Sequence, residues 1–272
     1  MAKLVDQRRT DPSPLQDSAG PKLHHILWTW AVQEIRLLIR EPVAIFFSLA
    51  FPLVIYAFIG TAYADEYVFE GVLFIDIMYP ALLGTVAANL ALMGIPIYLA
   101  ELRATRVLRY YASLPMPGWI FPCAVAIAFL SILIISVVLI STTVGISHGL
   151  RSNAFTPAFI GAFALLTWWL LVYGFFLGSL PLQTRTVQAI ATAVFFVMFF
   201  GSGATVPLDG LPEWLEWLTR LNPLRHWFDM LISIYTNGTV DMPEWYKLAP
   251  AIIVAVVMIP YTIRNFRRSD LS

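Results

Sequence analysis

The sequence has little charge for its length. Asp, Glu, Lys and Arg make up 12% of the 272 residues, whereas hydrophobic residues make up 59%. Soluble domains carry about 25% charged residues, so this chain cannot cover a water-facing surface of its size. The composition therefore predicts an integral membrane protein. The 17 basic and 17 acidic residues balance, which excludes a generally basic protein that binds nucleic acid.

Cysteine and the common catalytic motifs are also scarce or missing. The single cysteine, Cys123, lies in an apolar run and is expected to be a small buried residue that forms no intrachain disulfide. The sequence lacks the GxxxxGK[ST], HExxH and CxxC patterns, which mark phosphate loops, zinc proteases and redox sites. We expect no catalytic residue, no metal site and no cofactor bound by this chain.

Six stretches are apolar enough to cross a membrane. A spanning helix needs about 20 apolar residues for a hydrocarbon core of roughly 30 Å. The predicted fold is an all-α integral membrane protein with one transmembrane domain over residues 22–272, and residues 1–21 form a polar tail that we expect to be disordered. The predicted spans cover about 43–63, 77–100, 119–147, 154–182, 186–206 and 245–263.

The basic residues predict the orientation. Placing both termini in the cytoplasm puts 13 of the 17 Lys and Arg residues inside, as the positive-inside rule requires. The four on the outside are Arg151, Arg220, Arg225 and Lys247. Asp76 borders a span at its outer edge, where we expect the carboxylate to be solvated.

Two segments differ from simple spans. Residues 22–40 place Leu23, Ile26, Leu27, Trp30, Leu37 and Leu38 on one helical stripe, which predicts an amphipathic helix in the cytoplasmic interface, as an anchor or as a docking surface. The outer segment 207–247 contains two short apolar helices, separated at Asn222-Pro223. We expect both to dip into the outer leaflet, where their ends need protein partners.

Uncharged polar residues inside the spans are few. Asn89 and Gln188 are the costliest, because lipid offers them no hydrogen-bond partner. They either bond to other helices or line a substrate path. Glycines at Gly174 and Gly178 allow close helix approach, although the GxxxG pattern is common in membrane helices.

Residues 203–232 carry a glycine-rich span end, Pro207, Leu211-Pro212, an apolar helix and Asn222-Pro223. Residues 101–116 carry an acid, an arginine, a threonine and Leu114-Pro115. These two segments resemble the membrane subunits of type-2 ATP-binding-cassette exporters, which include daunorubicin-resistance and O-antigen permeases; the second is similar to the cytoplasmic stretch of that family. Residues 22–40, with Glu34 and Arg36, fit its entry helix.

The resemblance implies a half-channel without its own ATPase. Two permeases, identical or paralogous, would meet in the bacterial plasma membrane, and two ATPase subunits would bind ATP and Mg beneath them. The residues implied in ATPase coupling are Glu34, Arg36, Arg40, Glu101, Arg103, Thr105, Arg106 and Arg109. Those expected along the substrate path or its gate are Asn89, Gln188, Phe199, Trp214, Trp217 and Trp227. The structural motif comprises Pro207, Pro212, Asn222 and Pro223.

The expected cargo is an amphiphilic drug or a lipid-like molecule, as in multidrug efflux and antibiotic resistance, because the spans are rich in aromatic residues. Two alternatives stay open. A polysaccharide or lipid-linked glycan exporter would interleave its aromatics with polar groups, which are scarce here. A secondary transporter driven by an ion gradient would need buried charged pairs or an inverted repeat, and neither is apparent.

Overall fold

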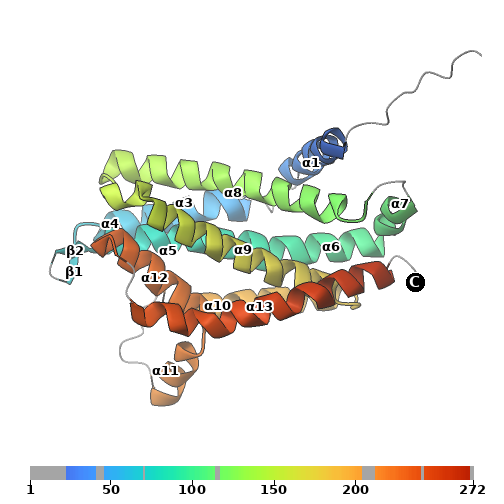
Figure 1. Cartoon of the computed structure of the whole chain (residues 1–272). Coiled ribbons are helices and arrows are strands. Elements are labelled where there is room, and N and C mark those ends of the chain that lie inside the picture. Colours follow the sequence, from blue (N-terminus) through green and yellow to red (C-terminus); the bar gives the residue numbers. More distant parts are fainter. Residues whose placement is uncertain are drawn as a thin grey trace, which may run out of the picture.

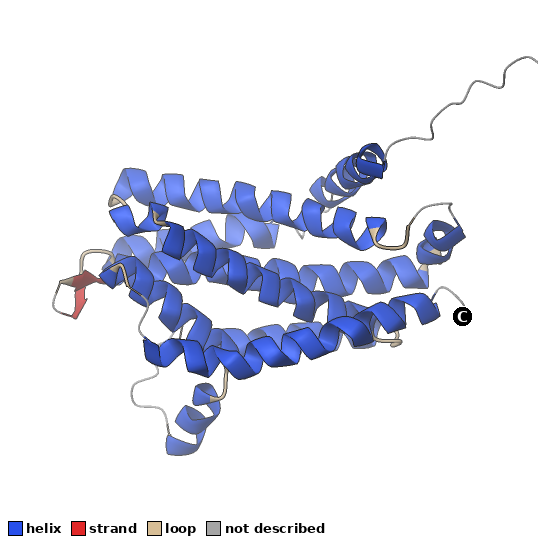
Figure 2. Ribbon diagram, in the orientation of Figure 1, coloured by secondary structure: helices blue, strands red, loops and turns tan. Residues whose placement is uncertain are grey.

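The computed structural model describes residues 23–40, 46–69, 71–113, 117–203, 212–239 and 242–269. In this part of the chain, helices form an elongated bundle (Figures 1 and 2). A small antiparallel hairpin, β1 (Tyr67–Phe69) with β2 (Val72–Leu73), lies at one end, and α7 (Val107–Ser113) lies at the other. We call these the hairpin end and the α7 end. The all-α prediction is confirmed apart from this hairpin, and the predicted tail lies outside the described residues.

Four helices of the described chain are long and apolar enough to cross a membrane. The first runs without a break from Phe74 to Ala104 and comprises α5 (Phe74–Asn89), the π-helical η3 (Leu90–Gly94) and α6 (Ile95–Ala104). The others are α8 (Ile120–Ser147), α9 (Pro157–Ser179) and the stretch Lys247–Phe266 of α13 (Met242–Ser269). These helices coincide with four of the six predicted spans.

The other two predicted spans fall on shorter apolar helices. One is Ser48–Tyr63 and the other is α10 (Thr184–Phe200). The first belongs to a helical stretch built from the π-helical η1 (Phe46–Ala50), α3 (Phe51–Ile55), the π-helical η2 (Tyr56–Gly60) and α4 (Thr61–Tyr63). Six crossings therefore stay a prediction. The remaining helices are α1 (Leu23–Ile39), the 3-10 helix η4 (Ser152–Phe155), α11 (Glu213–Arg220) and α12 (Pro223–Asn237).

The helix Phe74–Ala104 is the centre of the bundle. Its residues Val86, Ala88 and Leu92 are fully buried, and α8, α9, α10 and α12 contact it. Glycines let α9 approach it closely. A Cβ atom on Gly174 would lie 2.2 Å from the carbonyl oxygen of Ala91, and one on Gly178 would lie 2.7 Å from a methyl of Leu99. The Gly174-x-x-x-Gly178 pair therefore forms a close-packed seam.

The expectation that Cys123 is buried is wrong, and the predicted apolar stripe of α1 packs on protein only in part. α1 packs on α8 and buries Ala31, Glu34 and Leu38, whereas Leu23 of the predicted apolar stripe is 51% exposed. Cys123 is also exposed, on α8. The reason is the same in both cases. Where lipid surrounds a protein, an apolar side chain needs no protein partner, so apolar periodicity does not identify the face that packs.

The α9 seam generates a prediction with a matched control. We expect Gly174→Ala to lower the stability of the purified protein by about 1–3 kcal/mol, because the new methyl group would collide with a backbone carbonyl that cannot rotate away. Gly161→Ala, on the same helix, should instead be neutral or stabilising by up to about 1 kcal/mol, since a Cβ atom there meets nothing within 4 Å. Thermal unfolding in detergent measures both, and equal melting temperatures would contradict the seam.

Candidate functional site

The predicted coupling loop is a sharp elbow between two helices at the α7 end. α6 ends at Ala104, and the hydroxyl of Thr105 donates to the carbonyl oxygen of Glu101 at 2.9 Å. Arg106 then adopts a left-handed conformation with φ of 60°, which costs about 1–2 kcal/mol for a residue with a Cβ atom. The chain turns there into α7. Three charged side chains of this elbow are exposed: Glu101, Arg106 and Arg109.

Arg103 differs from its neighbours because it points into the bundle. Its Nη2 donates to the carbonyl oxygen of Gly178 at 2.7 Å, and its Nη1 donates to that of Leu180. These carbonyls belong to the last turn and the C-cap of α9, where no intrahelical partner exists. Nearby, the hydroxyl of Thr184 donates to the carbonyl oxygen of Ala100 at 3.2 Å. The base of the elbow is thereby tied to α9 and α10.

Glu34 attaches α1 to the same region. Its side chain is fully buried, and Oε2 accepts a hydrogen bond from the hydroxyl of Tyr98 in α6. The second oxygen, Oε1, is buried and has no hydrogen-bond partner among the described residues. Burial raises the pKa of the Glu34 carboxyl, and the Tyr98 bond opposes this only in part. Trp30 packs edge-on against Tyr111 of α7 at 4.5 Å between ring centroids.

Arg36 of α1 and Arg40, directly after this helix, are exposed. The structure therefore divides the predicted coupling residues into two groups. Glu34 and Arg103 hold helices together inside the bundle, and Thr105 closes the turn. The remaining members are charged side chains on the surface: Arg36, Arg40, Glu101, Arg106 and Arg109.

The hairpin end contains an ion pair that the sequence argument missed. Asp76 is 6% exposed rather than solvated. The guanidinium of Arg151 donates two hydrogen bonds to the Asp76 carboxylate, from Nε to Oδ1 at 2.8 Å and from Nη2 to Oδ2 at 2.6 Å. The same guanidinium donates to the carbonyl oxygens of Gly71 at 2.7 Å and Thr236 at 3.3 Å. The sequence does contain a hint of this pair. Asp76 and Arg151 each border an apolar span on the predicted outer side, and they carry opposite charges.

Asn222 and Pro223 join the end of α10 to the start of α12. The Asn222 side chain donates from Nδ2 to the carbonyl oxygen of Met198 at 2.6 Å, and its Oδ1 accepts from the backbone N–H of Leu224 at 3.0 Å. Pro223 occupies the first helical position, where no donor is needed. Pro212 directly precedes α11 as its N-cap, and Pro207 lies outside the described residues.

The residues predicted for the substrate path do not meet in one place. Trp227 is fully buried against Trp169, and Phe199 is buried and stacks on Phe195. Asn89 is half-buried and donates to the sulfur of Met93 at 3.6 Å, within its own helix. The other three are exposed: Gln188 on α10, and Trp214 and Trp217 on α11.

Comparison with known protein families identifies the family of the chain. Residues 26–236 match the sequence profile of the ABC-2 type transporter family. The chain belongs to this family. It is a multi-pass membrane permease subunit of the ABC-2 type, and like the family's membrane domain it lacks ATPase motifs.

Two curated relatives, from Escherichia coli K12 and from E. coli O157:H7, are each described as the probable multidrug ABC transporter permease YbhR. This ABC-2 permease is 28% identical to each over 122 residues, which cover 42% of this chain. The chain spans about a third (33%) of the length of these relatives.

The buried carboxyl of Glu34 generates a prediction about pH. Its raised pKa means that the folded state binds the proton more tightly than the unfolded state does. Its contribution to stability is therefore fully present below the unfolded pKa and is lost as pH rises through the folded pKa, by up to about 1.4 kcal/mol per pH unit. Glu34→Gln should remove this loss and raise the melting temperature at neutral pH.

Melting temperatures between pH 4 and pH 8 measure this effect. Glu66→Gln is the control, because it neutralises an exposed carboxylate at the hairpin end, away from Glu34, and should leave the difference between the two pH profiles in place. A profile for Glu34→Gln that runs parallel to the wild-type profile would show that burial of Glu34 does not govern it.

Proposed function

We propose that this ABC-2 permease is the membrane subunit of an ATP-driven exporter in the plasma membrane of a bacterium, with both termini in the cytoplasm. Two ATPase subunits would bind at the α7 end and hold the ATP and Mg. A second permease, identical or paralogous, would complete the channel. The cargo would be an amphiphilic drug or a lipid-like molecule taken from the cytoplasm or the inner leaflet.

The observation that carries the proposal is the charged surface of the α7 end. The elbow between α6 and α7 exposes Glu101, Arg106 and Arg109. Arg36 of α1 and Arg40, directly after α1, are exposed as well. The positive-inside rule accounts for the arginines, but it does not account for the hydrogen bonds that join the elbow to neighbouring helices. Arg103 and Glu34 fix the elbow to α9 and α1, so a force applied at the elbow would pass to the helices.

The exposed side of α10 supports an amphiphilic cargo. Phe196 and Phe200 stack at 5.9 Å between ring centroids, and Val197 beside them is 74% exposed. Gln188 is a polar side chain exposed nearer the α7 end of the same helix. The exposed polar side chains of α10, Arg185, Thr186 and Gln188, all lie near that end. An apolar surface beyond them suits a lipid-like molecule better than a sugar polymer, which needs many hydrogen-bond partners.

Purification from the native host tests the proposal directly. The tagged chain is extracted in a mild detergent, and mass spectrometry and an ATPase assay are applied to the eluate. We expect an ATPase with a phosphate loop at about equal stoichiometry, with turnover that amphiphilic cargo stimulates. A chain that elutes folded, alone and without ATP hydrolysis would instead favour a transporter driven by an ion gradient.

The elbow makes a sharper prediction in the assembled transporter. Glu101→Ala should leave the fold and the ATPase content intact but uncouple ATP hydrolysis from transport, because the exposed carboxylate would no longer engage the partner. Transport and hydrolysis are measured together in proteoliposomes. Glu66→Ala, an exposed acid at the hairpin end, is the control and should behave as wild type. Normal coupling in Glu101→Ala would remove this residue from the coupling surface.

A further inference from the structure

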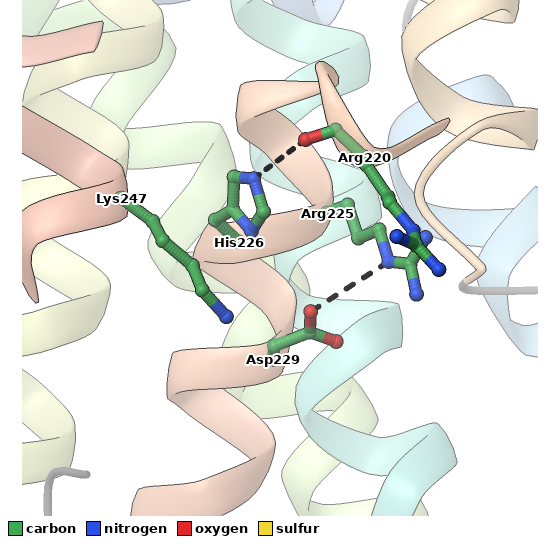
Figure 3. Close-up of a pocket in the computed structure, with 5 residues that line it drawn as sticks. All are labelled: Arg220, Arg225, His226, Asp229 and Lys247. Carbon is green, nitrogen blue, oxygen red and sulfur yellow. Dashed lines mark hydrogen bonds and ion pairs between the residues drawn. The ribbon is translucent and has the colours of Figure 1, made fainter. Parts of the chain in front are cut away.

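Two turns between consecutive helices differ in their cause. Between α11 and α12, the local sequence itself breaks the helix, because Asn222 caps α12 and Pro223 occupies its first position. A side-chain bond also crosses this turn: Nε2 of His226 in α12 donates to the carbonyl oxygen of Arg220 in α11 at 2.9 Å (Figure 3). The elbow between α6 and α7 contains no comparable helix-breaking residue.

The sequence around the elbow favours an uninterrupted helix. Residues 97–113 contain neither glycine nor proline, the residues that disfavour a helix most strongly. Only Thr105 and Arg106 separate α6 from α7. Helical hydrogen bonds also continue to the edges of this gap, because the N–H of Thr105 donates to the carbonyl oxygen of Glu101 at 3.0 Å and that of Tyr110 donates to Arg106 at 3.4 Å. Local sequence therefore does not explain the bend.

The bend places Arg106 in an unfavourable backbone conformation. Its φ of 60° is left-handed, and no other described residue except glycine has a positive φ. A residue with a Cβ atom adopts this conformation at a cost. A right-handed Arg106 would remove the cost and would offer carbonyls of α6 to the first N–H groups of α7, which have no acceptor within their own helix. Such strain persists only where surrounding contacts maintain it.

Tyr111 provides the contacts that hold α7 in the bent position. Its ring packs edge-on against Trp30 of α1 at 4.5 Å between ring centroids, and it lies 5.2 Å from the ring of Phe121 in α8. Leu108, one turn earlier on α7, is 7% exposed. One face of α7 is therefore packed, and this packing opposes the local preference for a straight helix.

We propose that the elbow is a joint with two states. In the bent state, Tyr111 packs on Trp30 and Phe121, and Arg106 is left-handed. In the straight state, Tyr111 leaves these rings, Arg106 becomes right-handed, and residues 95–113 form one helix. A partner that displaces α7 would thereby extend the central helix of the bundle by two turns.

The straight state moves the far end of α7. This helix has seven residues and is about 10 Å long, so Ser113 would shift by several ångströms relative to α10. Five residues connect Ser113 to Trp119, and a chain of that length can reach about 20 Å, which permits the shift. The use of the joint in coupling rests on the proposed function, whereas the joint itself is a property of this chain alone.

The distance between two spin labels tests the joint in the purified full-length chain, in lipid nanodiscs and without any ATPase. Cys123→Ser removes the native thiol, and the labels are attached at Ser113→Cys on α7 and Thr186→Cys on α10, both exposed positions. α10 is a suitable reference, because Thr184 bonds to the carbonyl oxygen of Ala100 at the base of the elbow. We expect a single distance in this background.

Tyr111→Ala should add a second distance that differs by at least about 5 Å, because the ring contacts that hold the bend are lost. Tyr110→Ala is the matched control, since Tyr110 is 64% exposed, and it should keep the single distance. Two further variants, Arg106→Gly and Arg106→Ala, both remove the guanidinium. Glycine tolerates the left-handed conformation, whereas alanine favours a helix. With Tyr111→Ala, the ratio of straight to bent states should be at least about tenfold higher for Arg106→Ala than for Arg106→Gly.

Amide hydrogen exchange distinguishes a straight helix from an α7 that has merely detached. The straight state should slow exchange at Val107, Leu108 and Arg109, because their N–H groups gain acceptors. Three results would overturn the proposal: one unchanged distance when Tyr111→Ala and Arg106→Ala are combined, equal effects of Arg106→Gly and Arg106→Ala, or a second distance without slower exchange. Because no ATPase takes part, these results do not depend on whether the chain assembles with one.

Discussion

Helix ends in a bundle surrounded by lipid leave backbone groups without partners, and a few polar side chains from other elements satisfy them here. Each helix has N–H groups at its start and carbonyls at its end that no intrahelical bond uses. Arg103 reaches from α6 to the carbonyls that end α9, and Asn222 bonds both the end of α10 and the start of α12. Arg151 does the same for the end of α12 and for the hairpin.

The bonds of Arg103, of Arg151 and from Asn222 to Met198 also hold the bundle together, because they join elements that are separate in the sequence. Lipid tails are as apolar as leucine, so burial of leucine against another helix provides little net driving force in a membrane. Close packing and interhelical hydrogen bonds have to supply the rest. The glycine seam of α9 provides close packing. Interhelical hydrogen bonds come from the side chains that cap helix ends and from Trp169, which donates to the carbonyl oxygen of Ala251.

Local sequence was sufficient to predict features that depend on local physics. Uncharged runs gave α8 and α9 to within a few residues, and Asn222-Pro223 marked the start of α12 because asparagine caps a helix and proline fits its first position. Partners distant in sequence set the rest. Nothing near Arg103 shows that it turns inward, and nothing near Glu34 shows that Tyr98 will bond it. The Asp76–Arg151 pair spans 75 positions of sequence, and only the fold brings its members together.

The shortness of α10 has a consequence for the surrounding bilayer. At about 1.5 Å per residue, its 17 residues extend about 26 Å, whereas the hydrocarbon core is roughly 30 Å thick. α9, which contacts α10, has 23 residues and faces no such shortfall. A short helix can cross where the lipid beside it thins, here by several ångströms, at a cost of a fraction of a kcal/mol per ångström. Lipid headgroups would then lie closer together across the membrane beside the stacked phenylalanines than elsewhere around the protein.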